Sequence, residues 1–292
     1  MDVLVVGANG LLGSATVAAA LDRSHTVSMA YHSSAPQFDL PAFACDITDT
    51  ERFESILEDV EPDVVVNCAA MTDVDACESN PQEAMDVNAK APERLAKHAT
   101  DRNAAFVHVS TDYVFDGEAR NRYDEDDQTN PVQVYGRSKL EGERAVLESV
   151  PEALVTRLSF VYGQRGDTGS IEGFPAWVTQ RLQAGEEVPL FTDQWITPSR
   201  AGAAASTIFE LVDASAAGPV HVASGTCTTP YEFGNAIATH QGYDTDLLIE
   251  GSMADVDRPA ARPEYTCLDT TRVETLLERP QPSLETDIQA IS

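Results

Sequence analysis

Short apolar runs alternate with amphipathic stretches through the first half of the chain. The runs have the length of buried strands, and the stretches between them repeat apolar residues at helical spacing. Strands are predicted over residues 3–6, 26–30, 64–67, 106–110 and 154–158, and helices near residues 12–21, 51–57, 81–100 and 134–147. Asp49 suits the N-cap of the second helix, and Pro81 suits the first turn of the third. This order predicts an α/β fold with a doubly wound parallel sheet of the Rossmann type.

The pattern changes near residue 163. Residues 163–173 are rich in glycine and polar side chains, and the shorter elements that follow are separated by prolines. We therefore predict a sheet domain over residues 1–162 and a smaller C-terminal α/β lobe over residues 163–292, with the chain free to pass between them. The acidic run at residues 124–127 is interpreted as a solvated loop rather than a metal site.

The N-terminus and the cysteines indicate a soluble protein that is not exported. The chain enters a glycine turn without a basic segment or an apolar stretch long enough to span a bilayer. Its five cysteines are odd in number, widely spaced and without a Cys-x-x-Cys pair, so they suggest neither a disulfide framework nor a zinc site. We expect a reducing compartment, the cytoplasm, and no metal.

The charge balance is the most unusual bulk property. The chain has 48 acidic and 19 basic side chains, a net charge of −29, and lysine only at positions 90, 97 and 139. Such a field repels nucleic acid and anionic membranes, so neither is expected as a partner. Self-repulsion costs stability unless it is screened, and at about 1 M salt the screening length falls to roughly 3 Å. Ordinary solubility is the simpler explanation, but the acid excess and the lysine scarcity together favour a halophilic protein.

A glycine turn follows the first predicted strand and opens the first helix. Gly7, Gly10 and Gly13 have the spacing G-x-x-G-x-x-G, a variant of the dinucleotide fingerprint. Glycines let the backbone approach a pyrophosphate, which then binds free N–H groups at the helix N-terminus. Residues 1–162 are therefore predicted to bind NAD(P). The candidate cofactor residues in this turn are Gly7, Asn9, Gly10, Leu11 and Leu12.

The end of the second strand bears on the choice between NADPH and NADH. This strand normally ends in an acid that binds the adenosine ribose, but here it runs into Tyr31, His32 and Ser33. An imidazole and a hydroxyl accommodate a 2′-phosphate better than a carboxylate does, so NADPH is favoured, although no arginine clamps this position. Asp46 and Ile47 are candidates for the adenine edge, with an ordinary capping turn as the alternative.

Tyr135 and Lys139 form the candidate catalytic pair. They are four residues apart and so lie on one face of a predicted helix. An ammonium group there would favour the phenolate and lower the pKa of Tyr135 toward a value useful for proton transfer. Thr111 ends a strand at its carboxyl end, where it can hydrogen-bond the carbonyl oxygen that Tyr135 protonates. Local capping is the alternative role for Thr111.

Another strand end would lie against the nicotinamide half of the cofactor. Its candidate residues are Cys68, Ala69, Ala70, Met71 and Thr72. Asn88 lies on the long predicted helix. It either orients groups near Lys139 or is satisfied within its own helix.

Taken together, these motifs resemble those of the dTDP-4-dehydrorhamnose reductase family of extended short-chain dehydrogenases. The resemblance covers nearly the whole chain, through the glycine turn and residues 67–70, 87–88, 110–117, 134–143, 157–163, 193–199 and 262–269. It implies reduction of the 4-keto group of a nucleotide-linked deoxysugar, dTDP-4-dehydro-L-rhamnose to dTDP-L-rhamnose, with the proton from Tyr135. The sugar-nucleotide 4,6-dehydratases usually carry an acid where this chain has Tyr113.

The resemblance also implies roles for particular residues. Lys139 would bind the nicotinamide ribose, and Thr111 would tune Tyr135. Substrate contacts are expected from Thr111, Asp112, Tyr113 and Phe160, which makes residues 163–292 a substrate-binding lobe beside them. Phe160 replaces a tryptophan common in the family, so the sugar meets an apolar platform without an indole donor and its identity stays open.

Two other interpretations keep the same fold. The regulatory subunit of methionine adenosyltransferase is similar to these reductases and acts as a binding partner, but retention of Tyr135, Lys139 and Thr111 favours an enzyme. An epimerase or dehydratase would need tightly retained NAD and an additional base. The sequence fixes neither the nucleotide nor the oligomeric state, for which a homodimer is one option.

Overall fold

The structure is a computed structural model that describes residues 1–291. Its centre is a seven-stranded parallel sheet in the order β10-β6-β5-β4-β1-β2-β3, so the predicted doubly wound Rossmann sheet is confirmed. Its strands are β1 (Asp2–Val6), β2 (Thr26–Tyr31), β3 (Ala42–Ala44), β4 (Val64–Asn67), β5 (Ala105–Thr111), β6 (Leu154–Leu158) and β10 (Gly218–His221). Ser292, the last residue of the predicted lobe, lies outside the described residues.

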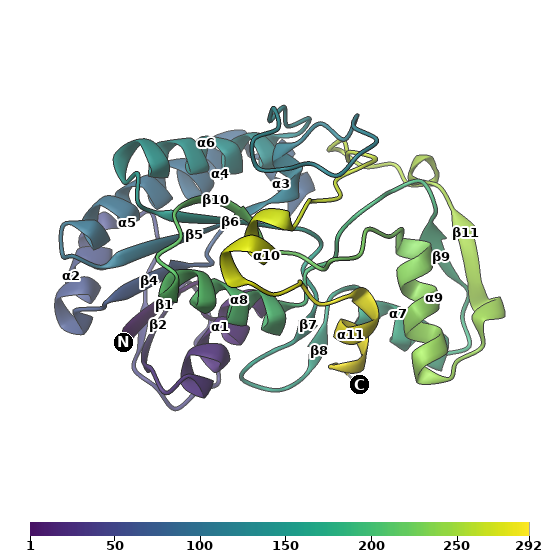
Figure 1. Ribbon diagram of the computed structural model, residues 1–292, viewed down its shortest axis with the longest axis horizontal. Helices are drawn as coiled ribbons and strands as arrows, with labels where there is room; N and C mark the ends of the chain where they lie inside the picture. The colour runs from purple at the N-terminus through teal and green to yellow at the C-terminus, as the bar shows by residue number, and fades with distance from the viewer. Residues whose placement is uncertain (292) are drawn as a thin grey trace.

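Helices cover both faces of the sheet (Figure 1). Side chains alternate along a strand, so Val3 and Val5 of β1 pack on one face while Leu4 and Val6 pack on the other. The first face is covered by α1 (Leu11–Asp22), α8 (Ala201–Asp213) and α10 (Thr271–Leu277). The second is covered by α2 (Thr50–Val60), α5 (Ala91–Thr100) and α6 (Val134–Ser149). Burial on both faces explains the continuous apolar runs.

The long helix predicted over residues 81–100 is divided into three segments. These are α4 (Pro81–Met85), a π-helical turn (Asp86–Lys90) and α5. Pro81 lies in the first turn, as predicted, and Asp49 caps α2 by accepting a hydrogen bond from the Arg52 N–H. Hydrophobic periodicity does not distinguish a π turn from an α turn, and such turns occur often at functional sites. A short helix, α3 (Val74–Ser79), precedes this region.

A smaller lobe lies beside the carboxyl ends of the central strands (Figure 1). It contains the parallel pair β9 (Val188–Phe191) and β11 (Leu248–Gly251), the hairpin β7 (Gly163–Gln164) and β8 (Ile171–Glu172), and the helices α7 (Phe174–Gln183), α9 (Pro230–Gln241) and α11 (Leu284–Gln289). Its apolar core includes Val178, Phe233 and Ile237. Between these elements the chain returns to the sheet through α8 and β10. Short 3₁₀ turns lie at Asp112–Val114, Thr245–Leu247 and Met253–Asp255.

The cysteine interpretation was wrong in one respect. Cys227 and Cys267 form a disulfide, while Cys45, Cys68 and Cys77 are free. The two partners are 40 residues apart in sequence. The segments that carry the two cysteines are brought together by isolated β-bridges, which pair residue 195 with residue 265 and residue 196 with residue 228. The spacing of the cysteines along the sequence gave no sign of these bridges. The cysteines no longer argue for a reducing compartment.

The acidic run at residues 124–127 is only partly a solvated loop. Glu125 is buried, and its carboxylate accepts a hydrogen bond from the His221 N–H at 2.8 Å. Burial raises the pKa of this carboxyl, although Arg272 lies 3.6 Å away. The error arose because strand β10, which buries Glu125, lies far along the sequence. Among residues 1–291, no helix is both long and apolar enough to cross a membrane.

Candidate active site

The carboxyl ends of β1, β4, β5 and β6 border a cavity of about 580 Å³, and a second cavity of about 720 Å³ adjoins it. The predicted residues that line the first are Gly7, Asn9, Gly10, Leu11, Leu12, His32, Ser33, Cys68, Ala69, Ala70, Thr72, Thr111, Asp112, Tyr113, Tyr135, Lys139 and Phe160. Asp46 and Ile47 line the second. Of the predicted residues, Met71 lines neither of these two cavities in the described part of the chain, and its N–H donates to Asn88 Oδ1 at 2.8 Å.

The glycine turn has the shape that a bound pyrophosphate requires. Gly7 has φ +79°, and a Cβ there would lie 2.6 Å from the Ala69 nitrogen. At Gly13 a Cβ would lie 2.1 Å from the Gly7 oxygen. Helix α1 begins at Leu11 with neither a side-chain cap nor an acidic residue in its first turn. Its first N–H groups therefore suit an anion, so the turn fits the diphosphate of a dinucleotide.

The ribose end of the site carries no carboxylate at the end of β2. His32 and Ser33 follow Tyr31 directly, and the His32 Nε2 lies 3.8 Å from the Asp46 carboxylate. Hydrogen bonds from Thr48 lower the pKa of Asp46. The Asp46 carboxylate therefore caps a local turn and also lines the second cavity, and its contact with the adenine edge stays a prediction.

Thr111 and Tyr135 meet at the junction of β5 and α6. The Thr111 hydroxyl donates to Asp112 Oδ1 at 3.1 Å and accepts a bond from the Tyr113 N–H at 3.2 Å. Burial raises the pKa of the Tyr135 phenol, while a hydrogen bond with Thr111 opposes this rise. Thr111 therefore caps the following turn and contacts the candidate acid as well.

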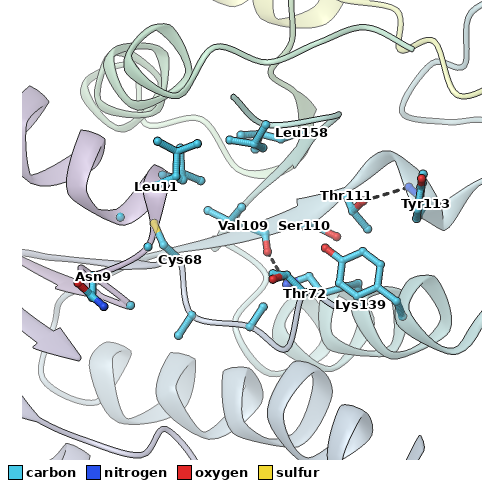
Figure 2. A pocket seen from close by; sticks show the side chains of 18 of the residues that line it. Asn9, Leu11, Cys68, Thr72, Val109, Ser110, Thr111, Tyr113, Lys139 and Leu158 are labelled. Carbon is cyan, nitrogen blue, oxygen red and sulfur yellow. Dashed lines mark hydrogen bonds between the residues drawn. The ribbon is translucent and has the colours of Figure 1, made fainter. Parts of the chain in front are cut away.

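The pKa of the Tyr135 phenol is raised overall, because burial outweighs the lowering that its spacing to Lys139 predicted. The Lys139 side chain is 2% exposed, and burial lowers the pKa of its amine to about 8. Its Nζ donates to the Val109 carbonyl at 2.6 Å, toward the strand that carries Thr111, as Figure 2 shows. Helical spacing places two residues on one face, but the burial of both groups decides their pKa values.

Asp112 is a buried carboxyl at the cavity wall. It is 3% exposed, and burial raises its pKa to about 6. Hydrogen bonds from Thr266, Ser159 and Thr111 oppose this rise, with Ser159 Oγ at 2.7 Å from Oδ2. Ser159 and Thr266 belong to segments far from Asp112 in sequence. No pattern in the sequence indicated that either residue supports the site.

Phe160 holds an unusual backbone conformation beside the cavity. Its φ is +46°, in the left-handed region that few non-glycine residues adopt. The ring contacts Phe174 edge to face, with the centroids 5.5 Å apart. Such strain persists where the surroundings hold a side chain in place and is common at ligand sites.

Asn88 lies on the π turn and bonds outside its own helix. Its Oδ1 accepts from the Met71 N–H, and its Nδ2 donates to the Met71 carbonyl and to Ser138 Oγ, each at 3.0 Å. It therefore ties the segment after β4 to helix α6.

Sequence reasoning missed His108, a buried residue next to Lys139, because a histidine within an apolar strand has the pattern of an ordinary core position.

A dinucleotide seated on the glycine turn would extend toward the cavity that holds Tyr135 and Lys139. This is the arrangement of NAD(P)-dependent oxidoreductases of the extended short-chain type, and the chain is an enzyme of this class. Within that class, the model described as the RmlD substrate binding domain matches residues 1–292, so the chain belongs to this family.

Individual relatives agree over nearly the full length. A probable low-salt glycan biosynthesis reductase, Agl14, of Haloferax volcanii is 53% identical and covers 100% of this chain and 97% of its own. A dTDP-4-dehydrorhamnose reductase of Mycobacterium tuberculosis is 38% identical over 92% of this chain and 84% of its own. The crystal structure of a dTDP-4-dehydrorhamnose reductase from Bacillus anthracis in complex with NADP superposes with a TM-score of 0.85, at 26% identity over 99% of this chain and 97% of that one.

Proposed function

We propose that the protein reduces the 4-keto group of a nucleotide-linked deoxysugar, converting dTDP-4-dehydro-L-rhamnose to dTDP-L-rhamnose. The observation that carries this proposal is that Tyr135, Thr111 and Lys139 line the same cavity as the glycine turn. The Mycobacterium and Bacillus relatives, both dTDP-4-dehydrorhamnose reductases, support the substrate class.

The cofactor supplies a hydride when it is bound. Its diphosphate would rest on the turn at Gly7 and Gly10, with the nicotinamide ribose held by Lys139. NADPH is proposed over NADH because His32 and Ser33, rather than a carboxylate, follow β2. The NADP complex of the Bacillus relative supports this preference.

Tyr135 is proposed as the acid that protonates the keto oxygen. A reduction needs a protonated donor, and burial keeps the phenol protonated at neutral pH. Thr111 would hydrogen-bond the same oxygen and hold it within reach. Once the proton has left, the positive charge of Lys139 on the same helix face would stabilise the phenolate.

The substrate is proposed to lie between the sheet and the smaller lobe. Asp112, Tyr113 and Phe160 line that side of the cavity and would contact the sugar nucleotide. In this proposal residues 1–162 bind the cofactor and also supply these three side chains, while residues 163–292, which contribute Ile196 to the cavity wall, complete the substrate side, apart from the return of α8 and β10 to the sheet. A cytoplasmic location and a homodimer remain predictions.

The test is an assay of the purified protein with dTDP-4-dehydrorhamnose and either NADPH or NADH, at low and at high salt. The expected result is cofactor oxidation only when the sugar nucleotide is present, with dTDP-rhamnose as the product. Absence of turnover at both salt concentrations would contradict the proposal and favour a regulatory subunit. Tightly bound NAD after purification, together with an epimerised or dehydrated product, would instead indicate an epimerase or dehydratase.

A further inference from the structure

A histidine lies in the buried layer next to Lys139. His108, in the middle of β5, is 0% exposed, and its Nε2 lies 3.5 Å from Lys139 Nζ. Its Nδ1 lies 3.3 Å from Nδ2 of Asn67, the last residue of β4. Neither His108 nor Asn67 takes part in the proton transfer proposed above. The three side chains form a row from β4 through β5 to α6.

Asn67 determines which nitrogen of His108 carries the proton. The Asn67 Oδ1 accepts from the Ala69 N–H at 3.2 Å, which leaves Nδ2 facing the imidazole. An amide nitrogen only donates, so His108 Nδ1 must accept. Burial keeps the pKa of His108 well below its usual value, and a neutral imidazole with Nδ1 as the acceptor carries its hydrogen on Nε2.

The Nε2–H of His108 therefore faces the amine of Lys139. An ammonium group has three donors and no acceptor, so the charged form of Lys139 opposes one donor with another. An uncharged amine accepts this hydrogen bond while it still donates to the Val109 carbonyl. The arrangement thus favours the neutral amine more than burial alone would.

Other titratable groups around Lys139 act in the opposite direction. Glu143 on α6, Cys68 after β4 and Cys77 on α3 all raise its pKa, but burial outweighs them and the pKa falls to about 8. The charge of Glu143 is shared with Arg157, whose Nη2 lies 2.7 Å from it. His108, on β5, is thus the neighbour whose hydrogen bond favours the neutral amine of Lys139.

We propose that His108 is a positioning residue that, in the tautomer fixed by Asn67, sets the protonation equilibrium of Lys139 and thereby the alkaline limit of turnover. The effect on turnover rests on the proposed reductase function. The tautomer and the lysine titration do not, so both can be measured on the protein without cofactor or substrate.

The first measurement is the protonation of the His108 ring in protein labelled with ¹⁵N-histidine, followed by NMR over pH 6 to 9. The expected spectrum shows hydrogen on Nε2 and none on Nδ1 throughout. Hydrogen on Nδ1 would overturn the proposal without any variant having to fold.

The second measurement is the titration of the lysine side chains in protein labelled with ¹³C-lysine. The chain has only three lysines, and Lys90 and Lys97 form exposed ion pairs that serve as internal references. Lys139 should titrate below both. In His108→Gln an amide oxygen can accept from the ammonium, so the Lys139 titration should rise by at least about 0.5 pH units.

Asn67→Asp reaches the same end by another route. A carboxylate facing Nδ1 would draw the hydrogen to Nδ1, leave Nε2 as an acceptor and again raise the Lys139 titration.

His221→Gln is the matched control, because His221 is also a fully buried histidine but lies on β10 and bonds the Asp269 carbonyl. An unchanged Lys139 titration in folded His108→Gln, or an equal shift in His221→Gln, would overturn the proposal. If the reductase assay succeeds, the alkaline limit of kcat should shift in each variant by the same number of pH units as the Lys139 titration.

Discussion

At the scale of single residues, burial governs the chemistry of the cavity. Loss of water raises the pKa of Tyr135 and keeps the phenol protonated, lowers the pKa of Lys139 and raises the pKa of Asp112. A site of this kind favours neutral groups before a ligand arrives. The charges that do form are then stabilised by the few hydrogen bonds aimed at them.

Tyr135→Phe tests the proton donor. Removing the hydroxyl should lower kcat at least about a hundredfold, because the keto oxygen then lacks its acid. Affinity for NADPH, measured by fluorescence titration, should stay within about twofold, since the ring remains. Turnover at the wild-type rate would exclude Tyr135 as the acid.

Asp112→Asn tests the cost of the buried carboxyl. The folded protein binds the Asp112 proton more tightly than the unfolded chain, with a pKa raised from 3.8 to about 6. This group therefore makes stability fall as pH rises through about 4 to 6, by roughly 3 kcal/mol at most. The variant should lose less stability between pH 4 and 7 in urea unfolding, although its activity should fall. The exposed control Asp59→Asn should follow the wild type, and a variant with the same pH dependence as the wild type would contradict the assignment.

At the scale of elements, helix α6 is the part of the fold on which the site depends most. It carries Tyr135 and Lys139, and at Gly142 it packs closely against the backbone of the π turn. A Cβ at Gly142 would lie 2.2 Å from the Asn88 carbonyl oxygen. Asn88 in turn holds the backbone of Met71 after β4. One close helix contact therefore aligns the proposed catalytic face with the proposed cofactor segment.

Gly142→Ala should separate α6 from the π turn. Because backbone atoms meet here, the variant should lose about 1 to 3 kcal/mol of unfolding free energy, and its kcat should fall. Gly202→Ala on α8 is the matched control, since a Cβ there meets no backbone atom and only the end of the Arg200 side chain, at 3.1 Å. That variant should be neutral or more stable by up to about 1 kcal/mol. Equal effects of the two substitutions would argue against the close contact.

The disulfide ties the segment before α9 to the segment before α10. Closing a loop between residues 40 apart restricts the unfolded chain, so reduction should cost about 2 to 4 kcal/mol. Thermal melting with and without reductant measures this, and a Cys227→Ala/Cys267→Ala protein should not respond to reductant. Thiol titration of the denatured, unreduced protein should find the three free cysteines. Five thiols would contradict the bond.

At the scale of the whole molecule, the acidic charge is sparse around the first cavity, whereas Asp46, Glu83 and Asp86 line the second. The cavity that holds the glycine turn is lined by one acidic residue, Asp112, among the residues described, together with His32 and Lys139. With a net charge of −29, most of the repulsion between acidic side chains lies outside the first cavity. An anionic cofactor in that cavity would therefore meet little local negative charge.

Added salt should stabilise the protein. Raising KCl from 0.1 to 2 M shortens the screening length from about 10 Å to below about 3 Å. The melting temperature should then rise by at least about 3 °C, or roughly 1 kcal/mol. Scanning calorimetry at constant pH measures the change. A melting temperature that stayed level or fell would remove the halophilic hypothesis.

Much of the sheet and of the cofactor turn was predictable because local patterns specify them. The apolar runs at residues 64–67 and 154–158 match β4 and β6 to the residue. Gly13 is required by contacts within one strand-turn-helix unit, whereas the close contact at Gly7 is with Ala69 after β4. The π turn, the buried Glu125 and the disulfide were not predictable, since each depends on a segment distant in sequence.

The sequence by itself determined the order of strands and helices, the glycine turn and the residue types that meet at the strand ends, because these follow from short-range periodicity and backbone sterics. The tertiary structure alone decided which of those residues are charged. It half-buried Tyr135, buried Lys139 and Asp112, brought Ser159 and Thr266 to the carboxyl, and placed His108 beside the amine. Protonation depends on solvent exclusion and on neighbours from distant segments, and neither is encoded in local spacing.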